Sequence, residues 1–258
     1  MRLEVADLIA RARDAVLPVI TLTDEELAAL DGPEAAPVAP QPWLERQESS
    51  GKLLACRVAL RGLAARGIVL PTGHTREDSR VAAIHQDVRS VLVMRRSAHG
   101  FVLAQRRGPR GHDARMLYLH DGGVLEESIS PGGLHALSVA APAAAAGRLA
   151  EFADPENTAT ASCDKSPQIM ALSDVATGTG AAYLQSARFI TTIGRLAQDA
   201  SGQPDERRIS IYALTDRLIL TEPAAHASEQ SCLAIGVISA DGLRQRLVRL
   251  VEGKPDNA

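Results

Sequence analysis

The sequence predicts an α+β protein with two pseudo-symmetric halves, each an antiparallel β-meander with packed helices. Two observations carry this fold class. A pattern of three short apolar segments, a serine and an amphipathic segment occurs twice, in residues 90–139 and in residues 209–251. Self-similarity of this kind points to a duplicated supersecondary unit. The chain has 258 residues, 45% of them hydrophobic, which is enough for one large domain or two small ones.

The first elements of the chain are expected to be helices. Residues 3–17 place apolar side chains at helical spacing, and Pro18 ends that segment. Thr23 and Glu26 have the spacing of a capping box, which predicts a second helix that begins after Thr23. Four prolines in residues 31–42 predict an extended linker or surface loop.

A third helix is expected over residues 52–66, because its apolar side chains fall on one broad side. These side chains are Leu53, Leu54, Val58, Leu60, Leu63 and Ala64. Gly67 then stands where a left-handed C-cap belongs. A short strand over 68–70 and a short helix over 77–87 follow.

The first meander is expected to contain strands over 90–94, 101–105 and 116–120, followed by a helix that Ser130 caps. The second begins with a helix over 183–198 and continues with strands over 209–214, 218–221 and 233–238. Its closing helix is expected to begin at Ser239. Glu126 and Glu127 fall at a strand end and are interpreted as solvated charges.

These elements suggest three segments, which we expect to form one globular unit. Residues 1–145 hold the N-terminal helices, the first meander and its helix. Residues 146–175 are an Ala/Pro/Thr-rich connection, parts of which are expected to be disordered. Residues 176–258 hold the long helix, the second meander and the C-terminal helix.

Composition argues against several classes of protein. A net charge of −3 disfavours nucleic-acid binding, which normally shows a basic excess. Cys56, Cys163 and Cys232 are far apart and form no metal or disulfide motif, so a reducing compartment is expected. The N-terminus lacks the residue order of a signal peptide, and no apolar segment is long enough to span a membrane. A cytoplasmic protein without membrane insertion is therefore expected.

No motif for catalysis is present. The sequence has no nucleophile elbow, no H-E-x-x-H, and in residues 176–180 a glycine-rich segment without the lysine of a phosphate loop. We therefore expect a non-enzymatic protein with no catalytic residues, no cofactor and no metal. Two alternatives stay open. One is a small-molecule enzyme whose pocket joins His112, His120 and acids from either half, and the other is a winged-helix DNA-binding regulator built on residues 53–69.

The most distinctive polar segment is residues 106–115, which are expected to form a loop between the second and third strands of the first meander. Its basic residues are candidates for contacting a protein partner, because arginine suits such interfaces. They are Arg106, Arg107, Arg110, His112 and Arg115. An ordinary solvated loop is the alternative. The second copy is expected to lack a counterpart of this arginine loop.

The order of segments resembles the EspG family of ESX (type VII) secretion-associated proteins. The segments that carry the resemblance are Leu22-Thr-Asp-Glu-Glu-Leu-Ala-Ala-Leu30, Leu63-Ala-Ala-Arg-Gly-Ile-Val69, Val91-Leu-Val-Met94, Phe101-Val-Leu-Ala104, Ser130-Pro-Gly-Gly-Leu134 and the last apolar segment, 242–251. The resemblance covers residues 20–252. Residues 1–19, the proline-rich 31–42 and Thr215-Asp-Arg217 depart from the family's pattern.

This resemblance implies a quasi-two-fold α/β architecture and a cytoplasmic, non-enzymatic chaperone. Members of that family bind the aggregation-prone tip of helical PE–PPE-type secretion substrates. The partner implied is thus a secreted helical protein or a PE/PPE-like heterodimer. In the family, the loop between the second and third strands contributes to substrate binding, which corresponds here to residues 106–115.

Overall fold

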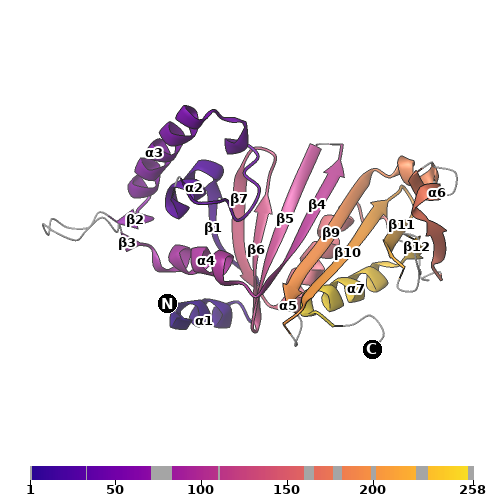
Figure 1. The fold of residues 1–258 in the computed structure, drawn as a ribbon. Coiled ribbons are helices and arrows are strands. Elements are labelled where there is room, and N and C mark those ends of the chain that lie inside the picture. The colour runs from indigo at the N-terminus through magenta and orange to yellow at the C-terminus, as the bar shows by residue number, and fades with distance from the viewer. Residues whose placement is uncertain are drawn as a thin grey trace, which may run out of the picture. The chain divides into compact units, whose positions relative to one another are not determined.

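A computed structural model describes residues 2–32, 34–70, 83–109, 111–159, 166–176, 182–198, 202–224 and 232–254. The α+β fold class is confirmed, because the described chain forms α-helices and antiparallel strands (Figure 1). The chain divides into two compact units. Unit 1 contains residues 1–98 and 116–141, and unit 2 contains residues 99–115 and 142–258.

Unit 1 combines four α-helices with a sheet in the strand order β1-β7-β6-β5. Its elements are α1 (Arg2–Arg11), β1 (Leu17–Thr23), α2 (Asp24–Asp31), the 3-10 helix η1 (Leu44–Arg46), α3 (Ser49–Ala65), the short pair β2 (Val69–Leu70) and β3 (Ala83–Ile84), α4 (Gln86–Ser97), the second half of β5 (Gly111–His120), β6 (Gly123–Ile129) and β7 (Leu134–Ala140). The chain leaves α4 and returns in the middle of β5, so this strand belongs to both units.

The sequence predicted the start of α2 and the end of α3 correctly. The Thr23 hydroxyl accepts a hydrogen bond from Glu26 N, and the Glu26 carboxylate accepts one from Thr23 N, which completes the capping box. Gly67 has a φ of +69°, the left-handed conformation expected at a helix C-terminus. Of the helix predicted over 77–87, residues 77–82 lie outside the described chain, and α4 begins at Gln86.

Two predictions in the first meander are wrong. Residues 90–94 lie in α4, because Val88, Val91 and Met94 recur every third residue and bury one side of a helix. Ser130 does not cap a helix but begins a turn into β7. Gly133 in that turn has a φ of +77°, and its carbonyl accepts a hydrogen bond from Asp24 N at 2.9 Å.

Unit 2 contains a sheet in the strand order β4-β9-β10-β11-β12-β8. Its elements are β4 (Gly100–Gly108), the first half of β5, α5 (Pro142–Ala153), β8 (Gln168–Ala171), α6 (Leu172–Ala176), the 3-10 helix η2 (Ala182–Ser186), β9 (Phe189–Gln198), β10 (Pro204–Ala213), β11 (Leu218–Pro223), β12 (Cys232–Ile238) and α7 (Ala240–Glu252). Helices α5 and α7 pack on each other, and α5 also contacts β4 and β9 (Figure 1).

The second meander and its closing helix are confirmed, and Ser239 caps α7 by accepting a hydrogen bond from Gly242 N at 3.0 Å. The helix predicted over 183–198 is wrong, because most of that segment is β9. Its burial alternates residue by residue, which is the period of a strand and not of a helix. Residues 106–115 are also not a loop: they are the end of β4, a turn at Pro109 and the start of β5.

The duplication is present in the order of elements, but it is displaced by one strand from the predicted one. Strands β4, β5, β6 and β7 are followed by α5, and strands β9, β10, β11 and β12 are followed by α7. The N-terminal part of the connection predicted over 146–175 is therefore helical, since it lies within α5.

Candidate protein-binding surface

The residues predicted to bind a partner divide between the two faces of one hairpin. Arg106 Nη1 donates to the carbonyl of Phe152 at 2.8 Å, and Arg106 Nη2 donates to Asp113 at 2.7 Å. Arg115 Nη1 donates to the carbonyl of Arg148 at 2.7 Å. Arg106 and Arg115 therefore point toward the C-terminal end of α5. Arg110 lies outside the described residues.

The side chain of Phe152 strengthens this arrangement. The guanidinium carbons of Arg106 and Arg115 lie 4.4 Å and 4.8 Å from the centre of its ring. These distances allow a cation–π interaction from both arginines. Because the last carbonyls of a helix lack partners within the helix, Arg106 satisfies one of them at Phe152, and Arg115 adds a second hydrogen bond to α5 that helps to hold the hairpin in place.

The hairpin of β9 and β10 repeats this arrangement against α7. Asp205 pairs with Arg195 and, at 3.0 Å, with Arg207 Nε. Arg207 also donates to the carbonyls of Gly253 and Lys254 at the end of α7. The expectation that the second copy lacks an arginine counterpart is therefore wrong. Both hairpins use an arginine and a following Asp-x-Arg to bind the next helix, which is a structural role.

Arg107 and His112 belong to the other face of the same hairpin. Successive residues of a strand point to opposite sides. Since Arg106, Asp113 and Arg115 face α5, their neighbours Arg107 and His112 face away from it, and both are exposed. Of the described residues in the predicted set, these two remain available for a partner.

Arg107 lies at one edge of a larger surface, which we call the open face. On β4, β9 and β10, the buried side chains occupy alternate positions on the side that faces α5, and no side chain between them is buried. The register places Phe101 beside Leu196, Arg107 beside Ile190, and Tyr212 beside Ile190 on β10. The open face consists of Phe101, Leu103, Gln105, Arg107, Ile190, Thr192, Gly194, Leu196, Glu206, Arg208, Ser210 and Tyr212.

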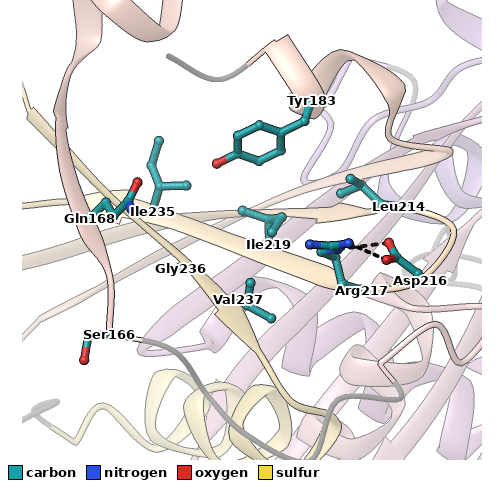
Figure 2. Close-up of a pocket in the computed structure, with 10 residues that line it drawn as sticks. All are labelled: Ser166, Gln168, Tyr183, Leu214, Asp216, Arg217, Ile219, Ile235, Gly236 and Val237. Carbon is teal, nitrogen blue, oxygen red and sulfur yellow. Dashed lines mark hydrogen bonds and ion pairs between the residues drawn. The ribbon is translucent and has the colours of Figure 1, made fainter.

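A pocket of about 460 Å³ continues this side of the sheet over β11, β12 and β8 (Figure 2). Ile219 pairs with Val237, and Ile235 pairs with Gln168, so these side chains share one side with Tyr212. Ile219 and Ile235 pack with Leu184 and Leu214 in a buried cluster. Figure 2 shows the ring of Tyr183 on the opposite side of the pocket from the aliphatic floor.

The pocket offers packing and hydrogen bonds but no acid–base pair. Asp216 and Arg217 at its rim are bonded to each other, with Arg217 Nε 3.0 Å from Asp216 Oδ1. That hydrogen bond lowers the pKa of Asp216 and raises the pKa of Arg217, so both groups stay charged. Among the described lining residues there is no histidine or cysteine. The pocket suits an apolar side chain with a polar neighbour.

A group of ionisable side chains in unit 1 has the composition of an active site but is buried, so a substrate cannot reach it. His135 lies between two carboxylates, with Nδ1 2.6 Å from Glu127 Oε1 and Nε2 2.6 Å from Asp24 Oδ1. All three side chains are completely buried. Asp24 also accepts hydrogen bonds from the backbone N–H groups of Trp43 and Leu44 at 2.7 and 2.9 Å.

Arg95 and Tyr118 complete this ionic cluster. Arg95 Nε donates to Glu127 at 2.9 Å and Nη1 to Asp31 at 3.0 Å, and the Tyr118 hydroxyl donates to Glu127 at 2.6 Å. Burial opposes ionisation of Glu127, but the hydrogen bond from His135 and the charge of Arg95 outweigh burial and lower its pKa to about 2. With every acceptor used internally, the cluster links α2, α4, β6 and β7 rather than binding a substrate.

The pKa of His135 moves the other way. Burial alone would lower it, but the hydrogen bonds to Asp24 and Glu127 outweigh burial and raise the pKa. A ring with a carboxylate acceptor at each nitrogen is held as the imidazolium. The interpretation of Glu126 and Glu127 as solvated strand-end charges is wrong, because both are buried within β6. Sequence offered no signal for this cluster, because its members lie up to 111 residues apart.

The histidines considered for an enzyme are not gathered into a site. His112 is exposed, whereas His120 Nε2 lies 3.0 Å from the carbonyl of Met94 in unit 1. Within the described chain, no group of three or more His, Cys, Asp or Glu side chains has an arrangement that could hold a metal ion. None of the described helices is long and apolar enough to cross a membrane.

No protein-family model matches the chain, and no curated protein matches it.

Proposed function

We propose that this chain is a non-enzymatic cytoplasmic chaperone or adaptor that binds a helical substrate of type VII secretion, similar to the PE/PPE-like heterodimers bound by EspG-like proteins. The open face of unit 2 carries this proposal. It presents aromatic and aliphatic side chains beside charged ones on strands whose other side is packed against helices. Such a mixed surface on a rigid sheet is typical of a protein-binding site.

The pocket beside the open face supports the same function. An exposed apolar tip of a helical secretion substrate needs a cover that excludes water until export. The floor of Ile219, Ile235 and Val237 can receive one apolar side chain, while Tyr183 and Gln168 offer hydrogen bonds at the rim. Arg107, Arg208 and Glu206 then supply the charged border that fixes orientation.

The DNA-binding alternative has less support. Residues 53–69 do form a helix followed by a short strand, but the exposed side of that helix is mainly leucine and valine, with only two arginines, Arg57 and Arg61. A helix that reads base edges presents polar side chains to the groove. The enzyme alternative has no described cavity in which its proposed residues meet.

The direct test is co-expression with each PE–PPE-type pair encoded in the same genome, followed by co-purification and titration calorimetry. We expect one pair to bind the wild-type chain, and Leu196→Glu to weaken that binding at least about tenfold, because a charge replaces an apolar contact on the middle strand of the open face.

Ile169→Glu is the matched control. Ile169 is 61% exposed and pairs with Ala234 on the opposite side of the same sheet. The Ile169→Glu variant should leave binding of the PE–PPE-type pair unchanged. The proposal fails if no pair binds the wild-type chain, or if both variants weaken binding equally.

A further inference from the structure

Helix α3 exposes most of the apolar side that the sequence predicted for the core. The helix packs against α2, and only Cys56, Ala59 and Leu63 are buried. Four large apolar side chains of the same helix are 43–63% exposed: Leu53, Leu54, Val58 and Leu60. An exposed apolar cluster of this size on one element marks an interaction surface.

The exposed surface of α3 has an ordered pattern. At 100° per residue, Leu54 and Val58 form one stripe along the helix, and Leu53 and Leu60 form a second. Arg57 and Arg61, one turn apart, lie between the two stripes and are exposed. Among the described residues neither arginine has an ion pair or a side-chain hydrogen bond, and the helix itself contains no acidic residue.

Gly62 is exposed beside the first stripe. Apart from its chain neighbours and the backbone of its own helix, no heavy atom lies within 4 Å of the position that a Cβ would occupy there. A glycine within a helix costs about 1 kcal/mol relative to alanine. Since no contact within the described chain requires a glycine at position 62, the open space there is available to the side chains of an approaching helix.

We propose that this surface of α3 binds a partner's amphipathic helix whose acidic residues, spaced one turn apart, lie between two rows of apolar side chains. The acids would pair with Arg57 and Arg61, while the apolar rows would pack on the leucine and valine stripes. Paired charges set the orientation of such a contact, and the apolar rows supply most of its affinity.

Two other occupants fit less well. A second copy of α3 would bring Arg57 and Arg61 against the same arginines with no acid between them, which is repulsive. Nucleic acid would be drawn to the arginines but would leave the exposed leucines without apolar contacts. The site on α3 is separate from the open face and does not rest on the function proposed above.

The probes are three synthetic amphipathic helices of about 20 residues, a length that supports helicity in water. They share one leucine pattern and carry glutamate, glutamine or lysine between the leucine rows. Binding to the full chain is measured by fluorescence anisotropy, with duplex DNA of random sequence as a fourth probe. We expect the glutamate helix to bind at least about tenfold tighter than the glutamine helix, with salt weakening the difference.

A charge-swapped variant makes the assignment specific. Arg57→Glu/Arg61→Glu should lose the preference for the glutamate helix and gain one for the lysine helix, whereas Arg244→Glu, at an exposed arginine of α7, should change neither. Equal binding of the three helices, or an unchanged preference in the double variant, would overturn the proposal. Tighter binding of the DNA than of the glutamate helix, lost in the double variant, would assign the surface to nucleic acid instead.

Discussion

Arginine serves different purposes in the two units. In unit 1, Arg95 is completely buried and belongs to a closed network in which Glu127 serves Arg95, Tyr118 and His135 together. In unit 2, arginines on two hairpins donate to a carbonyl at the end of α5 and to the carbonyls just after α7, and they remain partly accessible to water. The cost of losing a partner should therefore depend on burial and on how many groups share that partner.

The largest expected effect is at Glu127. Glu127→Ala leaves a buried arginine, imidazolium and hydroxyl without their common acceptor, so it should lower the free energy of unfolding by about 3–5 kcal/mol. Urea denaturation followed by circular dichroism measures the change, and Glu151→Ala on the exposed side of α5 is the control. A loss below about 1 kcal/mol would show that the buried network of unit 1 depends on its shared acceptor no more than the accessible arginines of unit 2 depend on theirs.

The second prediction concerns pH and His135. Because the pKa of His135 is raised in the folded chain, its contribution is full below the unfolded pKa of about 6.5 and is lost as pH rises through the folded value. Near pH 6, His135→Gln should cost about 2–3 kcal/mol, and the cost should shrink in alkaline buffer. Unfolding curves of both proteins at several pH values test this. Parallel pH profiles would show that His135 is not charged in the fold.

The third prediction compares the two hairpins directly. Asp205 pairs with both Arg195 and Arg207, and the side chain of Arg195 is only 7% exposed. Asp113 is 34% exposed and pairs with Arg106, which keeps its bond to the Phe152 carbonyl. Asp205→Ala should therefore cost about 2 kcal/mol and Asp113→Ala about 1 kcal/mol. The reverse order in thermal or urea unfolding would contradict this account of the repeat.

The smallest expected effect is at Arg107. Arg106→Ala should cost about 1.5 kcal/mol because it removes a helix-end hydrogen bond and the contact with Phe152, whereas Arg107→Ala should stay within about 0.5 kcal/mol. When partner binding is measured the order should reverse, and Arg107→Ala should weaken binding more than Arg106→Ala. If Arg107→Ala lowered stability as much as Arg106→Ala, Arg107 would be making contacts within the chain and the open face would not be accessible to a partner there.

The sequence correctly predicted features that depend only on neighbouring residues, such as helix caps. The capping box at Thr23, the left-handed Gly67 and the serine cap of α7 depend on residues within a few positions of one another, and all three are confirmed. The second meander is confirmed because its apolar segments pair with their neighbours along the chain, β10 with β11 and β11 with β12.

Errors arose where tertiary contacts override a local pattern. The apolar residues 183–198 fit a helical period as well as a strand, and pairing with β4 and β10 decides for the strand. Ser130 resembles a helix cap, but Gly133 approaches Asp24 so closely that only a turn fits. The ionic cluster and the open face join residues from distant parts of the chain, so no spacing of residues in the sequence predicts them.

Neither unit is an uninterrupted length of polypeptide. The backbone passes between them at residues 98–99, 115–116 and 141–142. During synthesis on a ribosome, the β4 segment therefore emerges before residue 141 completes unit 1, yet its partner β9 is made only some fifty residues after that point. Unit 2 can therefore close only after all residues of unit 1 have been made. For the same reason, a fragment cut at any one of these three crossings would carry a strand that has lost a neighbour.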